Sequence, residues 1–448
     1  MRKGWMRLRE TFWFVPAIFG ISAVIFAQAV ITIERLFLKS DPQMTIGIGV
    51  GSLLYHVGAS GSRDILGAIG GSMLGVAATS FSITISVLAT ASSTYGPRLV
   101  RNFMADRGNQ VVLGVFGATF LYSLMVLRSI RSLDSDGSTF VPDIAVNIAV
   151  VLAVLDVGVL VYFIHHIAQS IQVGTLSSRV RDELSSTVNE LYPPELPGDA
   201  VSFADEALPP ILVKVPASRS GVVIDVDENA LLTAAVDTDS VVVIRCHPGD
   251  HVLEGDSVAE VRRLPGDLGD DIDDDAMKHM REAVEIGDAR TPRHDVSFAV
   301  EQLTEMAVRA LSSGTNDPYT ARNSLDDISV GLTVLVERPA PCTARGDKSG
   351  SLRLVLRRVP ANDLIDHVLD AVRIYAMGSP MVVKAGIRLA ERLGAAATRT
   401  ETIDHILRHL DLLEDAIGRD MTDPAGNAAC LVDIARTRQD IQGSSVRA

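Results

Sequence analysis

The most informative residues of this chain lie in an apolar segment, residues 65–92, and its immediate flanks. Small or hydroxylated residues recur there at alternating spacings of four and three: Ala68, Ser72, Gly75, Thr79, Ser82, Ser86, Ala89 and Ser93. At about 100° per residue these positions share one narrow face of a helix, which we call the small-residue stripe. In lipid, small residues let helices approach closely, and hydroxyls bond across the contact. The stripe predicts either a seam of tight helix packing or a hydroxyl-lined path for an ion or small polar solute.

A single acidic residue, Asp156, stands in the middle of another apolar segment, LAVLDVGVL. A carboxylate at membrane depth is costly, so it marks a functional site by default. Asp156 could bind a cation or carry a proton. The alternative is that it is protonated and hydrogen-bonded to a neighbouring helix, and the sequence leaves both interpretations open.

Two other polar sets are not expected to bind metal. His165 and His166 are adjacent in sequence, and neighbouring side chains diverge by about 100° on a helix, so they cannot chelate one ion well. The acidic run at residues 267–275 does not have the glycine and the terminal glutamate of a calcium-binding loop at the required spacing. We interpret it as a solvated loop that ends in a helix cap. No metal is therefore predicted.

A polar loop at residues 311–321 links two strongly helical segments. Gly314 can end the first helix, while Asn316 and Asp317 precede Pro318, which suits the first position of the second. Capping explains this composition, and a role for Asn316 and Asp317 in binding a small ligand or partner is the alternative. The chain shows no nucleophile elbow, P-loop or glycine-rich dinucleotide motif before a helix, so we expect no catalytic residues and no cofactor.

The elements that must position these residues are membrane helices. A bilayer core requires about 20 apolar residues of helix, and four segments qualify: residues 13–33, 65–92, 111–127 and 144–164. The first begins like a signal peptide, but it is long enough to span and no clean cleavage site follows. These segments predict an α-helical domain in the lipid bilayer over residues 1–172. Residues 45–57 are too short to span and are expected to lie at the interface or re-enter the membrane.

Basic residues near the helix ends predict the orientation. Nine lie on the side of the termini and five on the other side. We therefore expect a multi-pass protein of the bacterial inner membrane. Both termini and the soluble domain are expected to be cytoplasmic, with the loops at residues 37–63 and 129–142 outside.

The soluble part divides into three segments by composition. Residues 173–208 read as a linker helix and a proline-rich loop, residues 209–264 as a small β-sandwich-like module, and residues 265–448 as an α-helical cytoplasmic domain. The module's PGDHVLEGD turn resembles half of a biotinyl- or lipoyl-carrier fold. No lysine lies between Lys214 and Lys278, so a structural or coupling module is expected and not a covalent carrier.

Charge and cysteine content narrow the classes of protein further. The 448 residues carry a formal net charge of -14, and the acidity belongs to the C-terminal part. This distribution argues against nucleic acid as a partner, which requires a basic face. The three cysteines, Cys246, Cys342 and Cys430, are far apart and form no paired motif, as is typical of a reducing compartment.

Three motifs together resemble one family, the bacterial predicted membrane proteins called domain of unknown function 2254. They are SFSITISVLATASSTYGPRLVRNFMADRGNQVVLGVFGATFLYSLMVLR, VYFIHHIAQSIQV and DVSFAVEQLTEMAVRALSSGTNDPYTA, and the likeness spans nearly the whole chain. Family members more often have SP at Tyr95-Gly96-Pro97 and SPG at Ser312-Ser313-Gly314. The resemblance implies a membrane protein and carries no established activity.

Two functions fit these observations. The first is a homo-oligomeric channel or transporter-like protein for an ion or small solute, with residues 65–92 at its axis and a cytoplasmic regulatory domain. The alternative is a membrane-anchored scaffold or signalling protein without transport activity. Ion flux through the purified protein in liposomes would distinguish them.

Overall fold

The computed structural model describes residues 12–40, 58–96, 106–130, 140–170, 172–203, 208–263, 272–292 and 294–445. The chain divides into two compact units, Met1–Thr175 and Leu176–Ala448. The interfacial segment expected at residues 45–57 and most of the acidic run lie outside the described residues. At the end of that run, Asp273 stands at the N-cap of a short helix.

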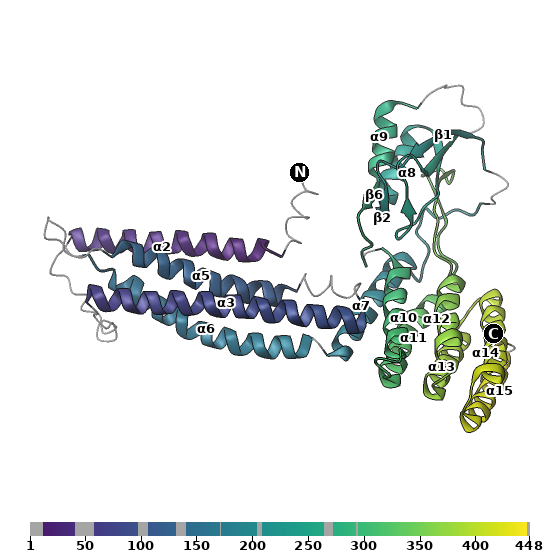
Figure 1. The fold of residues 1–448 in the computed structure, drawn as a ribbon. Coiled ribbons are helices and arrows are strands. Elements are labelled where there is room, and N and C mark those ends of the chain that lie inside the picture. The colour runs from purple at the N-terminus through teal and green to yellow at the C-terminus, as the bar shows by residue number, and fades with distance from the viewer. Residues whose placement is uncertain are drawn as a thin grey trace. The chain divides into compact units, whose positions relative to one another are not determined.

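The first unit consists, in its described part, of four long apolar helices (Figure 1). They are α2 (Phe14–Ser40), α3 (Ala59–Tyr95), α5 (Arg107–Ser129) and α6 (Asp143–Ser170). Each is long and apolar enough to cross a membrane. The helices extend beyond the apolar segments visible in the sequence because polar residues at their ends keep the helical conformation. The 37 residues of α3 span roughly 55 Å, well over the roughly 30 Å of a hydrocarbon core.

Helix α5 is the centre of this bundle, since α2, α3 and α6 all pack against it. Its buried face includes Val112, Phe116, Thr119, Ser123 and Val126, spaced by three and four residues. Apolar contacts form two separate clusters along the bundle. One cluster contains Leu66, Tyr122 and Ala149, and the other contains Ala77, Phe116 and Phe163.

Two buried polar side chains fix the start of α6. The Glu34 carboxylate on α2 accepts hydrogen bonds from the backbone N–H of Ile144 at 3.0 Å and of Ala145 at 3.4 Å. The Tyr122 hydroxyl on α5 donates to the carbonyl of Ala145 at 3.1 Å. A carboxylate suits a helix N-terminus because the unpaired N–H groups there carry partial positive charge. These contacts tie three helices together at one level.

The second unit contains all but the first three residues of α7 (Val173–Leu191), together with two β-sheets. The strands are β1 (Ile211–Pro216), β2 (Gly221–Val226), β3 (Ser240–Ile244), β4 (His251–Val252), β5 (Ser257–Arg263), β6 (Val284–Gly287), β7 (Ala344–Gly346) and β8 (Leu352–Val355). One sheet has the order β1-β5-β3-β8-β7, and the other has the order β4-β2-β6. Only the β3–β8 pair among these ladders is parallel. A single apolar core that includes Val223, Val242 and Leu354 joins the two sheets.

The sheets draw on more of the chain than residues 209–264. Strands β6, β7 and β8 come from the part expected to be helical, and helix α8 (Glu228–Asp237) interrupts the expected β stretch. The three extra strands are only three or four residues long, too short to show a period in the sequence. The polar residues 347–350 connect β7 to β8.

Helices complete this unit. They are α9 (Asp274–Glu282), α10 (Val296–Ala310), α11 (Pro318–Glu337), α12 (Ala361–Tyr375), α13 (Pro380–Ala396), α14 (Thr400–Asp420) and α15 (Pro424–Ser445). From α10 onward they pack pairwise, α10 with α11 and α12, α11 with α13, α12 with α14, and α13 and α14 with α15 (Figure 1). Helix α7 joins them through Leu184, whose side chain fills the space beside Gly331.

Candidate functional site

The small-residue stripe lies on the face of α3 that no other described helix covers. All eight of its members are exposed in the single chain. The buried face of α3 carries Leu66, Ala77, Ser80, Thr84 and Ala91 instead. At about 100° per residue, the stripe lies roughly opposite this packed face. Within one chain the stripe therefore takes no part in holding the bundle together.

Two hydroxyl groups of the stripe donate hydrogen bonds to carbonyl groups of their own helix. Thr79 donates to the carbonyl of Gly75 at 2.9 Å, and Ser93 donates to the carbonyl of Thr90 at 2.9 Å. Such hydrogen bonds along the helix leave the hydroxyl without need of an outside partner. The stripe can thus face either water or the packed surface of another helix.

A second small-residue pattern overlaps the stripe and was missed in the sequence. Gly67, Gly71 and Gly75 are four residues apart, and the position that a Cβ would occupy at each is open space. Glycines at this spacing allow two membrane helices to cross with their backbones in close approach. Their spacing was visible in the sequence, but the free space beside them was not.

Asp156 lies on α6 and is 1% exposed. Neither of its carboxylate oxygens has a hydrogen-bond partner in the described part of the chain. The side chain of Thr119 on α5 interacts with the carboxyl group, but not with the geometry of a hydrogen bond. Unsatisfied buried polar groups are rare and call for an explanation.

Other unsatisfied polar atoms lie on the inward face of α5. The Ser123 hydroxyl and both polar atoms of the Asn109 amide are buried and have no partner among the residues described. Along α5, Thr119 falls between Phe116 of one apolar cluster and Tyr122 of the other. Asp156 falls likewise between Ala149 and Phe163 on α6. The bundle interior thus has a polar layer, made of Asp156 and Thr119, between two apolar clusters.

The structure separates this polar layer from the small-residue stripe. Asp156 is buried between helices, whereas the stripe is exposed on the side of α3 turned away from α5. The two candidate sites therefore do not line one cavity within a single chain. Any shared path would require further copies of the chain.

The adjacent histidines on α6 have different surroundings. Nε2 of His166 is 3.2 Å from the Asp106 carboxylate, and the His166 ring stacks on Tyr162. His165 is exposed. Asp106 is also the N-cap of α5, where it accepts a hydrogen bond from the N–H of Gly108 at 2.7 Å. The His166–Asp106 pair thus joins the last turns of α6 to the start of α5.

The loop before α11 has the geometry of a helix cap. Asp317 accepts hydrogen bonds from the Thr320 N–H at 3.1 Å and the Thr320 hydroxyl at 2.6 Å, which lower the pKa of its carboxyl below the ordinary value. Pro318 occupies the first turn. Asn316 has a φ of 46°, a left-handed conformation that asparagine tolerates, and Gly314 is exposed. Both Asp317 oxygens are engaged in the cap, so a ligand would compete with it.

A cavity of about 400 Å³ lies in the second unit, between α7, β2 and β7. Its wall includes Arg345, paired with Asp199 at 2.7 Å, and His294. His294 lies between Asp225 at 2.6 Å and Glu190 at 2.8 Å. Hydrogen bonds to these two carboxylates, the first to Asp225, raise the pKa of His294 to about 9. The wall of this cavity is held by ion pairs.

A cluster that we did not single out in the sequence lies between α12 and α14, where Asp366 meets His405 and His409. The two histidines are four residues apart, so their shared helix face could have been recognised. Asp366 could not, because it is 39 residues away from His405 and reaches it only through packing of the two helices.

Comparison with known proteins places these residues in context. A family model described as predicted membrane protein (DUF2254) matches residues 9–392, which include the stripe, Asp156 and the loop before α11 but not His405 and His409. Uncharacterized proteins of Mycobacterium bovis and Mycobacterium tuberculosis are each 30% identical over 441 residues, or 97% of this chain and 81% of their own length. No solved structure matches the chain.

Proposed function

The chain belongs to the DUF2254 family of predicted membrane proteins, and we propose that it is an oligomeric channel or transporter for protons or monovalent cations. The observation that carries the proposal is the unpaired carboxylate of Asp156, buried in a helix long enough to span a membrane. Ionisable residues at such positions characteristically mark ion pathways and proton relays. A purely structural carboxyl would be expected to resemble Glu34, whose oxygens accept backbone hydrogen bonds.

The polar layer around Asp156 supports a binding site for a small cation. Thr119 supplies a hydroxyl oxygen on the facing helix, and oxygen donors are the ligands that hard cations prefer. The apolar clusters on both sides would restrict water to this layer. A proton or a desolvated monovalent cation is therefore the class of substrate that we favour.

Flux through the purified protein in liposomes tests the proposal. We expect proton or potassium flux from wild type and a loss of at least about tenfold in Asp156→Asn, which keeps the shape and removes the charge. The matched control is Asp64→Asn, because Asp64 is exposed at the start of α3. Wild-type liposomes that pass neither ion, or an Asp156→Asn variant that conducts normally, would exclude this role.

The free face of α3 supports assembly into a homo-oligomer. In lipid the hydrophobic effect does not drive helices together, so close packing and hydrogen bonds must do so. The stripe and the glycines at 67, 71 and 75 form an exposed surface on which a second α3 could pack closely. We propose that α3 helices of several copies meet at this face.

A membrane-anchored scaffold or signalling protein is the second candidate. It is favoured by the stripe hydroxyls that bond to their own helix, since such a surface suits a dry contact between helices. This candidate also predicts assembly through α3 but no ion flux, so the liposome assay separates the two functions.

The second unit would then act as the regulatory part. We propose that it lies on the cytoplasmic side together with both termini, because basic residues are more frequent near the helix ends on that side. Its cavity of about 400 Å³ has a size that suits a small ligand.

A further inference from the structure

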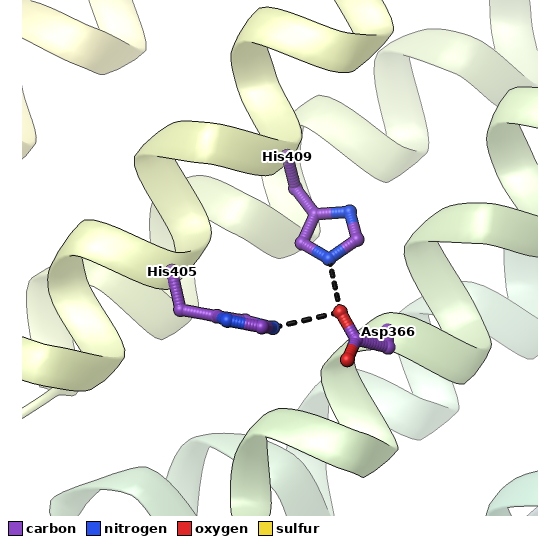
Figure 2. Close-up of side chains that lie close together, drawn as sticks. All are labelled: Asp366, His405 and His409. Carbon is purple, nitrogen blue, oxygen red and sulfur yellow. Dashed lines mark hydrogen bonds and ion pairs between the residues drawn. The ribbon is translucent and has the colours of Figure 1, made fainter.

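Two histidines and one aspartate converge where α12 packs on α14 (Figure 2). Nε2 of His405 is 2.7 Å from Oδ1 of Asp366, and Nε2 of His409 is 2.5 Å from the same oxygen. Burial alone would raise the pKa of Asp366, but hydrogen bonds from the two imidazoles lower it below the ordinary value. Three groups that commonly bind metals therefore point at one place.

The backbone explains this convergence. His405 and His409 are one turn apart on α14, so their side chains share a face. Two histidines at this spacing on one helix are a recurring zinc-binding arrangement. Asp366 approaches from α12, so the set joins two helices that are separate in sequence. A site of this kind depends on the fold of the unit and not on a local peptide.

The distances suit a single ion after a small movement. In protein sites, zinc lies about 2.0–2.2 Å from each nitrogen or oxygen ligand. The ligand atoms of a tetrahedral site are therefore about 3.3 Å from one another. Here one donor atom from each of the three residues lies within 4.8 Å of the others. To admit the ion, the two imidazole nitrogens must come to lie about 3.3 Å apart, and the carboxylate must retreat by less than about 1 Å. Its side chain is 43% exposed, whereas those of His405 and His409 are 10% and 5% exposed, so it has room to move.

Further oxygens lie one turn away on the same helix faces. Oδ1 of Asn362, four residues before Asp366, is buried without a hydrogen-bond partner among the described residues. The hydroxyl of Thr402, three residues before His405, is likewise buried and unpaired. Such atoms could bind a water molecule held by the ion, which would satisfy groups that otherwise have no partner.

We propose that Asp366, His405 and His409 bind a divalent transition-metal ion, with solvent completing its coordination. Two imidazoles and one carboxylate are the ligand set of many zinc and iron(II) sites with an open position. The bound ion would link α12 to α14 and stabilise the second unit. This inference is independent of the proposed transport function.

In its observed position, Arg408 would oppose metal binding. Its guanidinium lies 2.5 Å from Nδ1 of His405. An arginine can only donate, so Nδ1 must accept and the His405 proton must sit on Nε2, the atom that would bind the metal. Metal binding therefore requires the proton to leave Nε2 and Arg408 to move away. Arg408 is exposed, which permits that movement, and its positive charge also repels a cation.

Zinc binding to the full-length protein in detergent tests the site. The protein is first stripped with a chelator, and Zn²⁺ affinity is then measured by competition with a coloured chelator. We expect one tight equivalent per chain, weakened at least about tenfold in Asp366→Asn and in His405→Gln. The control is His367→Gln, an exposed histidine next to Asp366, which should bind as wild type does. Arg408→Gln should bind several-fold more tightly.

Thermal unfolding with and without Zn²⁺ provides the second readout. Zinc should raise the unfolding temperature of wild type but not of the folded Asp366→Asn variant, because only an ion bound to the native state stabilises it. Wild type that does not bind, or Asp366→Asn and His405→Gln variants that bind normally, would overturn the proposal. If these two variants fail to fold, exposed Arg408→Gln decides the question, since unchanged affinity there contradicts the site.

Discussion

Buried polar side chains in the membrane unit are of two kinds, and the difference separates structure from function. Glu34 and Tyr122 have hydrogen-bond partners at the start of α6, so their burial is explained by the packing of the bundle. Asp156 is buried equally well without such a partner in the described chain. An unpaired buried carboxylate costs free energy, so a functional reason is needed for Asp156 and not for the other two.

A single histidine in the second unit should make stability depend on pH. His294 joins Asp225 of β2 to Glu190 of α7, and its pKa is raised from an ordinary value of 6.5 to about 9. The folded state therefore holds the proton more tightly than the unfolded state. The resulting stabilisation is fully present below pH 6.5 and is lost as the pH rises through 9. We expect it to be roughly 2 kcal/mol, because exposed Glu190 is partly screened by solvent.

The measurement is the unfolding temperature of the full-length protein between pH 6 and pH 10. The wild type should lose stability across this range relative to His294→Gln, which has no charge to lose. His279→Gln is the control, since His279 is exposed on α9 and should retain the wild-type dependence. Identical pH profiles for wild type and His294→Gln would contradict the assignment.

Residues differ in how far the sequence alone reveals their role. Asp156 can be recognised in the sequence as a single acidic residue in an apolar segment, because the residues next to it in the chain show that it lies in a membrane helix. Asp366 is one of many acids on amphipathic helices, and its histidine partners are brought close only by helix packing. Asp317 is intermediate, because the following proline indicates a cap, but the hydrogen bond from the Thr320 hydroxyl depends on the side-chain geometry.

At the scale of elements, α3 shows what a periodic pattern can and cannot predict. The spacing of the stripe correctly identifies one narrow helix face. It does not identify which face packs inside the chain, because the buried face is also rich in small and hydroxylated residues such as Ala77, Ser80 and Thr84. Which face of α3 is buried depends on how its side chains pack against α5, and the sequence of α3 alone does not contain that information.

The short strands show a second limit. β7 has three residues and β8 has four. In such short segments an alternation of apolar and polar residues cannot be distinguished from chance. β8 is fixed as a strand by its parallel pairing with β3, through Leu354 beside Val242. A pairing between segments more than 100 residues apart cannot be read from either segment alone.

The free face of α3 leads to a prediction about assembly. Gly75 belongs both to the stripe and to the glycine series, and it has open space beside it. Gly75→Leu should prevent close approach of a second α3, because overpacking costs about 1–3 kcal/mol per site. We expect the mass of the purified particle in detergent, measured by light scattering, to fall to that of a smaller assembly or a monomer.

Ile83→Phe is the matched control for Gly75→Leu. Ile83 is 42% exposed on the same helix but lies to one side of the stripe, so added bulk there should leave the particle mass unchanged. The reverse result, loss of assembly in Ile83→Phe alone, would mean that copies meet on a different face of α3.

Across the molecule, the two units differ in how well their elements can be predicted from the sequence. The four membrane helices are long and apolar, so hydropathy alone locates them, and the structure confirms four candidate spans. In the second unit the chain leaves the five-stranded sheet after β5 (Ser257–Arg263) and returns to it 80 residues later at β7 (Ala344–Gly346). Composition changes only gradually over this stretch, so a division into a β module and a helical domain could not be exact.

The orientation of the chain in the membrane is a property of the whole molecule. The excess of basic residues near the helix ends predicts that both termini and the second unit are cytoplasmic. Labelling in intact cells with a membrane-impermeant thiol reagent can test it, because the native cysteines Cys246, Cys342 and Cys430 are all buried and give little background. Ser60 at the start of α3 and Ser349 between β7 and β8 are both exposed and serve as reporter positions.

A cysteine at Ser60 should react in intact cells, since this end of α3 is predicted to lie outside. A cysteine at Ser349 should react only after the cells are opened, since the second unit is predicted to lie inside. Labelling of both proteins after lysis is the control that each thiol is accessible in the folded protein. Reaction of Ser349→Cys but not Ser60→Cys in intact cells would reverse the topology and place the second unit, with its histidine and aspartate cluster, outside the cytoplasm.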